Sequence, residues 1–224
     1  MSHQKEGINK HKRLALWLGV FVLLVASIVL IVKASTPQTS KEPTQVISGE
    51  IPAVDASDWV RGNQLAAKTI VEYSDFQCPA CKSYEPIVKD IEKEFGSSVR
   101  IVYRHFPLTQ IHKNSLAASY AAEAAGIQGK FWEMHDLLFE KQELWAESTT
   151  AADLFVGYAQ ELGIDMEKFK TDRVSAQVRD RVQRDSDSGT AAQVPGTPTF
   201  FLNGKHIDSP RSFAAFKALL EASD

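Results

Sequence analysis

The chain has 224 residues, a length that fits one ordinary domain or two small ones and excludes a large multidomain assembly. Hydrophobic residues make up 44% and charged residues 24%, which is typical of a globular protein rather than a collagen-like or broadly disordered one. The formal net charge is -3, and residues 34–224 carry twenty basic and twenty-seven acidic side chains. This acidic excess repels polyphosphate backbones, so we expect no nucleic-acid partner.

The first predicted element is an apolar helix from Leu14 to Val32, nineteen residues without an ionisable group. A helix rises about 1.5 Å per residue, so this one nearly matches the roughly 30 Å hydrocarbon layer of a membrane. Basic residues precede it, which predicts a cytoplasmic N-terminus and an extracytoplasmic remainder. A cleaved signal peptide is the alternative, but its apolar core is normally about 7 to 15 residues, so we favour a retained single-pass signal-anchor in the cell membrane.

The next segment, residues 34–56, is rich in Pro, Ser and Thr and has neither helical nor strand periodicity. We therefore expect three parts: a cytoplasmic stub and transmembrane anchor over residues 1–33, a flexible linker over 34–56, and one folded domain over 57–224.

The two cysteines of the chain, Cys78 and Cys81, form a C-x-x-C motif. The β-branched and aromatic run Thr69–Tyr73 before them predicts a strand, and apolar residues at three-to-four spacing up to Phe95 predict a helix after them. Pro79 suits the first position of that helix, which makes Cys78 its N-cap.

A cysteine at a helix N-cap faces unpaired backbone N–H groups and the positive end of the helix dipole, and both stabilise the thiolate. We therefore predict that Cys78 is an acidic, exposed nucleophile. Cys81, one helical turn further on, is expected to point into the domain and to act as the resolving thiol, so that the pair can carry two electrons.

The alternative for a C-x-x-C motif is half of a zinc site, which needs two further ligands. The chain has no other cysteine, and its histidines do not form the H-x3-H pair that would complete a tetrahedral set. We expect no metal and no cofactor.

The middle of the chain begins with a predicted strand at Val99–His105 and continues with predicted helices over residues 114–125, 131–142, 150–162 and 165–189. Most of the large apolar side chains there are expected in the core, whereas Phe76 and Phe106 are expected to be exposed contacts near the cysteines.

Asn203-Gly204 predicts a hairpin turn between strands at Thr199–Leu202 and Lys205–Ile207. Pro198 directly precedes the first strand, and the Thr197–Pro198 bond is either a cis peptide or part of an ordinary turn.

Two segments, VEYSDFQCPAC at residues 71–81 and VPGTPTFFLNG at residues 194–204, resemble the DsbA-like branch of the thioredoxin superfamily, which are exported bacterial thiol-disulfide oxidoreductases. The resemblance implies an α/β fold, a thioredoxin-like mixed sheet with a helical insertion at about residues 108–190. It also implies that Cys78 attacks, that Cys81 is its partner, and that Pro198 is a cis-proline beside them. Thr197 would then offer its backbone to the substrate and tune the thiolate.

Glu72 matches the buried acid that related proteins keep beneath the active site. Because burial raises the pKa of a carboxyl group, Glu72 is expected to accept the proton of Cys81; the alternative is a pair with a strand neighbour such as Arg104. Ala80 stands where the strong oxidants of the family have a histidine between the cysteines. The resemblance therefore implies a milder oxidant.

The main hypothesis is a disulfide oxidase that acts on reduced substrate proteins and is reoxidised by a quinone-linked membrane partner of the DsbB or vitamin K epoxide reductase type. A reductase or isomerase of the same fold is one alternative, and a non-enzymatic metal-binding or chaperone module is another.

Overall fold

The computed structural model describes residues 14–28 and 50–223, which belong to two separate units with a boundary at residues 45 and 46. In the first unit, residues 14–28 are helical. A search of these described stretches finds no helix with both the length and the apolar character needed to cross a membrane. The last residues of the predicted span from Leu14 to Val32 lie outside the described residues. Most of the predicted linker, residues 34–56, also lies outside them.

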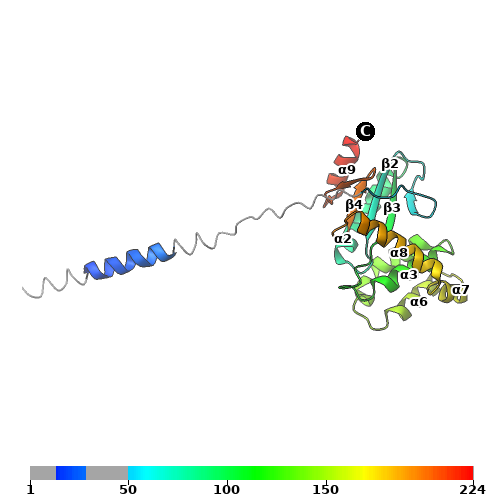
Figure 1. The fold of residues 1–224 in the computed structure, drawn as a ribbon, viewed down its shortest axis with the longest axis horizontal. Coiled ribbons are helices and arrows are strands. Elements are labelled where there is room, and N and C mark those ends of the chain that lie inside the picture. Colours follow the sequence, from blue (N-terminus) through cyan, green and yellow to red (C-terminus); the bar gives the residue numbers. More distant parts are fainter. Residues whose placement is uncertain (1–13, 29–49, 224) are drawn as a thin grey trace, which may run out of the picture. The chain divides into compact units, whose positions relative to one another are not determined.

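The second unit is built on a five-stranded mixed sheet with the order β1-β3-β2-β4-β5. Strands β2 and β3 are parallel, and the other neighbours are antiparallel. This is the sheet of a thioredoxin-like α/β fold (Figure 1). The strands are β1 (Trp59–Gly62), β2 (Lys68–Ser74), β3 (Val99–His105), β4 (Thr199–Leu202) and β5 (Lys205–Ile207).

Helices cover both faces of this sheet. Alternate residues of β2 point to opposite faces: Ile70 packs with α2 (Pro79–Phe95) and α9 (Phe213–Ala222), whereas Val71 and Tyr73 lie on the side of α8 (Ala176–Ala191). Because both faces are covered, the central strands are almost completely buried.

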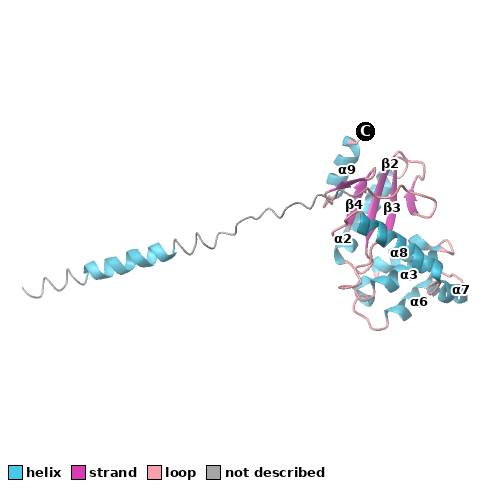
Figure 2. Cartoon of the chain, viewed as in Figure 1, coloured by secondary structure: helices cyan, strands magenta, loops and turns pink. Residues whose placement is uncertain are grey.

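A helical region lies between β3 and β4 in the chain. Figure 2 shows its helices gathered beside the sheet, where they enclose a separate apolar core. The segment predicted as one helix over residues 131–142 is divided at Lys141, and the segment over residues 165–189 forms two helices. The helices before α8 are α3 (Ser115–Gly126), α4 (Phe131–Glu140), α5 (Gln142–Trp145), α6 (Ala151–Glu161) and α7 (Met166–Asp172).

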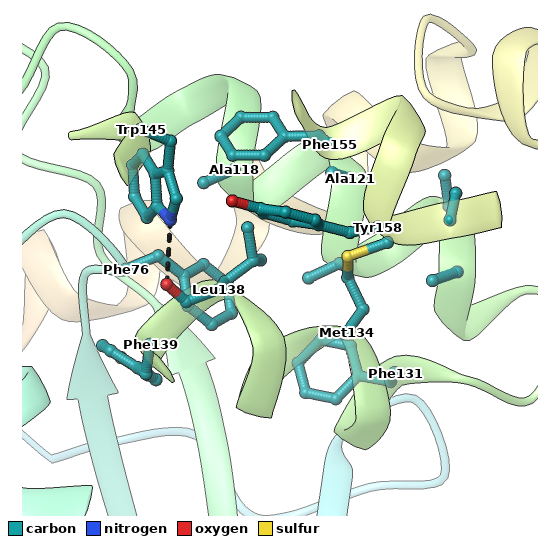
Figure 3. Close-up of a cluster of buried hydrophobic side chains, with 14 of the residues drawn as sticks. Phe76, Ala118, Ala121, Phe131, Met134, Leu138, Phe139, Trp145, Phe155 and Tyr158 are labelled. Atoms are coloured by element: carbon teal, nitrogen blue, oxygen red, sulfur yellow. Dashed lines mark hydrogen bonds between the residues drawn. The ribbon is translucent and has the colours of Figure 1, made fainter. Parts of the chain in front are cut away.

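The two phenylalanines expected at the surface are not exposed there, so this prediction is wrong. Phe76 is fully buried in the helical core, beside Phe139 of α4 (Figure 3). Its ring also stacks on that of Tyr103 at a centroid distance of 5.1 Å. Phe106 is half-buried, with its ring against Tyr73 and the backbone of Gly189. Both residues follow strand ends, where the sequence predicts open loops, but α4 packs over Phe76 and α8 packs over Phe106.

Candidate active site at the start of helix α2

The turn between β2 and α2 is held by the carboxylate of Asp75. Its two oxygens accept hydrogen bonds from the backbone N–H of Gln77 at 2.8 Å and of Leu108 at 2.9 Å, and the carboxylate also contacts Nδ1 of His112 at 2.7 Å. The backbone N–H of Cys78 donates to the carbonyl of Asp75 at 3.0 Å. This buried turn fixes where the helix begins and therefore where Cys78 lies.

Cys78 is the N-cap of α2 and Pro79 is the first helical residue, as the sequence pattern predicts. The Sγ atom lies 3.4 Å from the carbonyl oxygen of Thr197, to which it donates when the thiol is protonated. The residue is only 7% exposed, so the expectation of an exposed nucleophile is wrong: the segment at Thr197 and the start of α5 cover it.

The pKa of Cys78 is lowered to about 5. The largest cause is a hydrogen bond from the Cys81 thiol; burial opposes it, and the backbone N–H groups of Cys81 and Ala80 and the Thr197 hydroxyl lower the pKa further. The helix start thus stabilises the thiolate as the N-cap position predicts. Ala80 contributes through its backbone, although its side chain carries no charge.

Cys81 is fully buried. Burial raises the pKa of its thiol, and the negative charges of Cys78 and Glu72 raise it further. The pair therefore consists of one thiol that is ionised at neutral pH and one that keeps its proton.

Glu72 lies in the middle of β2 and is 2% exposed. Burial raises its pKa to about 7, even though Ser74 and Arg61 act in the opposite direction. One carboxylate oxygen is buried without a hydrogen-bond partner. A carboxyl group with this pKa can take up or give a proton near neutral pH, which is what an exchange with Cys81 requires.

The alternative pairing of Glu72 with Arg104 is wrong. In the register of the parallel strands Glu72 is opposite Tyr103, and Arg104 is opposite Tyr73, so the two charged side chains belong to opposite faces of the sheet. Arg104 instead forms a buried ion pair with Asp58 at 3.0 Å.

The Thr197–Pro198 peptide bond is cis. The contact between Cys78 and Thr197 joins residues 119 positions apart in the sequence, so the two motifs form one site. The structure therefore brings Cys78, Pro79, Ala80 and Cys81 at the start of α2 together with Thr197, which precedes the cis Pro198. Glu72 lies in β2, where its charge raises the pKa of Cys81.

Several residues that support the site were not identified from the sequence. The side chain of Gln142, at the start of α5, donates to the carbonyl oxygens of Phe76 at 2.7 Å and of Cys78 at 3.0 Å. Gln77 donates to the carbonyl of Ala146 and accepts from the N–H of Asn114, so it ties the turn to the helical region. The aspartate two residues before Gln77 is a local signal for a turn, but nothing local marks Gln142.

A group of three side chains beneath the site has donor atoms close enough to suit a metal ion. Among the residues that the structure describes, ligand atoms of Glu85, His135 and Asp136 lie within 4.8 Å of one another. Neither cysteine belongs to this group. Asp136 also contacts the cationic groups of Arg61 and of Lys89, the latter at 3.2 Å, so its negative charge is already compensated.

A thioredoxin-like sheet, an ionised thiol at the start of a helix, a buried partner thiol and a neighbouring cis-proline define a thiol-disulfide oxidoreductase of the thioredoxin fold. The sequence model of the family described as Thioredoxin matches residues 55–222, and the chain belongs to this family.

Solved structures of DsbA-like proteins resemble the chain. BdbD from Bacillus subtilis in its oxidised form is 27% identical with a TM-score of 0.68, and the match covers 79% of this chain and 97% of that one. A thioredoxin-like oxidoreductase from Silicibacter pomeroyi is 25% identical with a TM-score of 0.64, over 75% and 93% of the two chains. Wolbachia pipientis alpha-DsbA1, at 16% identity and a TM-score of 0.66 over 77% and 92%, shares the fold. The chain has the thioredoxin fold and is similar in structure to these proteins.

The curated relatives carry a different name. Na(+)/H(+) antiporter NhaA 3 from Salinispora tropica is 40% identical over 173 residues, which are 77% of this chain and 26% of that protein. Na(+)/H(+) antiporter NhaA 1 from Salinispora arenicola is 39% identical over 80% of this chain and 26% of its own length. The chain thus spans about a quarter of the length of these relatives.

Proposed function

We propose that this protein is a disulfide oxidase that introduces disulfide bonds into secreted or surface proteins through the Cys78–Cys81 pair. The observation that carries the proposal is the opposite ionisation of the two thiols: the pKa of Cys78 is lowered to about 5, whereas burial raises the pKa of Cys81. A cysteine pair is a stronger oxidant when its reduced form is more stable. The thiolate of Cys78 stabilises the reduced form of this pair.

The size of the effect follows from the ionisation of Cys78. At about pH 7 a thiol of pKa about 5 favours the thiolate by about a hundredfold, whereas a thiol of ordinary pKa, about 8.5, remains mostly protonated. The reduced form is therefore stabilised by about 2.7 kcal/mol, which raises the potential of this two-electron couple by about 60 mV. This difference shifts the exchange equilibrium toward the oxidised substrate by about a hundredfold.

The proposed reaction starts from the Cys78–Cys81 disulfide. A substrate thiolate attacks Sγ of Cys78, the bond to Cys81 breaks, and Cys81 leaves with the electron pair and takes a proton from Glu72. The second substrate thiolate then attacks the substrate sulfur of the mixed disulfide, and Cys78 leaves as a thiolate. Two electrons pass from the substrate to the pair, and the substrate leaves with a disulfide.

Ala80 sets the strength of the oxidant in this proposal. It provides a backbone N–H to the thiolate but no imidazole, so we expect a potential below that of family members with a histidine at this position. We expect it to stay well above the potential of reducing thioredoxins.

The proposal includes an anchor and a location. The apolar segment from Leu14 to Val32, preceded by basic residues, supports a single membrane span with the catalytic domain outside the cytoplasm. Reoxidation then requires a membrane partner, and a quinone-linked protein would accept the two electrons. The antiport activity named for the longer relatives is not part of this proposal.

The test uses the full chain as the enzyme. Its substrate is a second, reduced protein that is active only after its disulfides have formed. Oxidised wild-type protein should restore the activity of this substrate, and Cys78→Ser should abolish the restoration. Ser83→Ala, two residues after Cys81, serves as the control and should behave like the wild type. Restoration by Cys78→Ser would contradict the proposal.

The direction of the reaction is tested in growing cells. An oxidase keeps its cysteines mainly as the disulfide, and a reductase or isomerase keeps them mainly as dithiol, so alkylation of free thiols in acid-quenched cells separates the two. One equivalent of zinc retained after mild dialysis, with both thiols protected from alkylation, would instead favour a metal-binding module.

A further inference from the structure

The turn that carries Cys78 has one peptide group without a donor, because Pro79 lacks a backbone N–H. The N–H of Gln77 donates to the carboxylate of Asp75, and the N–H of Cys78 donates to the carbonyl oxygen of the same residue. The peptide group between Cys78 and Pro79 can form hydrogen bonds only through the carbonyl oxygen of Cys78. This oxygen accepts the first backbone bond of α2, from Lys82 at 3.2 Å.

Gln142, the first residue of α5, provides a second donor to this oxygen. Its side-chain amide donates to the carbonyl oxygen of Cys78 at 3.0 Å and to that of Phe76 at 2.7 Å. The contact with Cys78 is therefore shorter than the backbone bond from Lys82. One amide group has two N–H bonds, so a single side chain holds two carbonyl groups of the turn. The proposed reaction assigns this residue no role.

The amide of Gln142 is itself held in place by its surroundings. The residue is only 4% exposed. Trp145, one turn further along α5, is fully buried, and its indole N–H donates to the carbonyl oxygen of Leu138 at 2.9 Å (Figure 3). The side chain of Asn114 donates to the carbonyl oxygens of Trp145 and Ala146, both at 3.0 Å. The donor thus lies on a rigid support, which a residue that orients a reactive group requires.

The orientation of these peptide groups determines what faces the sulfur of Cys78. The backbone N–H groups of Ala80 and Cys81 stabilise the thiolate. A carbonyl oxygen carries partial negative charge, so a peptide group that turned its oxygen toward the sulfur would destabilise the thiolate. Cys78 has the extended backbone of an N-cap, with φ -72° and ψ 120°, and the bond from Gln142 holds its carbonyl group in this position.

We propose that Gln142 is a positioning residue for the nucleophile: its amide fixes the carbonyl groups of Phe76 and Cys78, and so keeps the sulfur of Cys78 facing the N–H groups at the start of α2. The inference deepens the oxidase function proposed above and rests on it. In that reaction Cys78 leaves the mixed disulfide as a thiolate, so a fixed helix start favours both this step and the reduced form of the pair. Gln142 acts through the two carbonyl groups and transfers neither a proton nor an electron.

The test measures two properties of the reduced full chain: the titration of Cys78, followed by thiolate absorbance, and the equilibrium of the cysteine pair with glutathione. Gln142→Met nearly keeps the length of the side chain and removes the donor. The midpoint of the titration should rise by about one pH unit, which is a tenfold loss of thiolate stability. The equilibrium constant for reduction of the pair by glutathione should therefore fall by about tenfold.

Two controls separate positioning from a general loss of packing. Gln183→Met makes the same change at an exposed position of α8, where the amide bonds to Asp187, and should alter neither measurement. Gly189→Ala places a methyl group against Phe106 on the face of the sheet opposite to α2. It should destabilise the fold without moving the titration of Cys78.

Three results would overturn the proposal. The first is a folded Gln142→Met protein in which Cys78 titrates as in the wild type. The second is an equal shift in Gly189→Ala, which would assign the effect to packing. If Gln142→Met does not fold, Gln142→Asn decides, because its amide is one methylene group short of the carbonyl oxygens: a wild-type titration is then the third. Failure of the wild type to oxidise a reduced protein, with the shift in Gln142→Met present, would instead contradict only the proposed oxidase function.

Discussion

Glu72 is a buried carboxyl group in the central strand β2, and we predict that replacing it with glutamine stabilises the folded protein at alkaline pH. Glutamine has nearly the same shape and cannot ionise. In the wild type, burial raises the pKa of Glu72 from 4.5 to about 7, so the folded state holds this proton more tightly than the unfolded state does.

The sign of the pH dependence follows from this shift. The contribution of Glu72 to stability is fully present below its unfolded pKa and is lost as the pH rises through its folded pKa. A shift of about 2.5 units corresponds to about 3 kcal/mol in the free energy of unfolding. Between about pH 4 and about pH 8.5, the wild type should therefore lose about 3 kcal/mol that Glu72→Gln does not lose.

The assay is urea unfolding of the oxidised protein at a series of pH values, because the disulfide removes both thiols from the titration. At each pH, the free energy of unfolding of the variant minus that of the wild type gives the pH-dependent contribution of the Glu72 carboxyl group. Glu94→Gln on α2 is the matched control: its carboxylate is 44% exposed and paired with Lys217, so its removal should change stability by less than about 1 kcal/mol.

A difference between Glu72→Gln and wild type that stays constant from acid to alkaline pH would refute the reasoning. It would mean that Glu72 is ionised in the folded protein at an ordinary pKa, and that it does not hold a proton for Cys81 near neutral pH.

Three further predictions concern the cysteine pair and the packing of the sheet. With a disulfide-containing substrate, Cys81→Ala should accumulate a mixed disulfide visible on non-reducing gels, because the Cys78 thiolate opens the substrate disulfide and no Cys81 thiol is present to release it; faster release than in the wild type would contradict the assignment. Thr197→Val removes a hydroxyl that lowers the pKa of Cys78, so that pKa should rise and the reduction potential should fall by up to about 30 mV for each unit by which the pKa rises, as measured by equilibration with glutathione. Gly189→Ala should destabilise the protein by about 1 to 3 kcal/mol in urea unfolding, because the added methyl group would lie 2.6 Å from the ring of Phe106; Gly157→Ala, with no atom within 4 Å of the new methyl group, is the control and should be neutral or stabilising.

The elements around the active site could be predicted because their signals are local. Asn203-Gly204 determines the hairpin of β4 and β5, and both strands have the predicted bounds. Pro79 and the apolar spacing after Cys81 locate the start of α2. These patterns act over a few residues, so tertiary contacts do not change them.

The errors concern burial, which depends on distant parts of the chain. Phe76 follows a strand and looks like a loop residue, but α4 covers it with Phe139. Cys78 is covered by the segment at Thr197, which no local pattern places there. The partner of Arg104 depends on strand register, which puts it on the face opposite to Glu72.

The supporting residues of the site could not be predicted for the same reason. Gln142 reaches the backbone of Cys78 from 64 positions away, and the backbone N–H of Asn114 reaches the side chain of Gln77 from 37 positions away. Their sequence contexts do not indicate these contacts. Only the three-dimensional arrangement shows that they belong to the site.

The most direct test of the account is a titration of the Cys78 thiol in the reduced wild-type protein, followed by thiolate absorbance or by the rate of alkylation. The account predicts a single ionisation at a pKa of about 5, with Cys81 still protonated at neutral pH. A pKa of about 8.5, the ordinary value of a free cysteine, would contradict it.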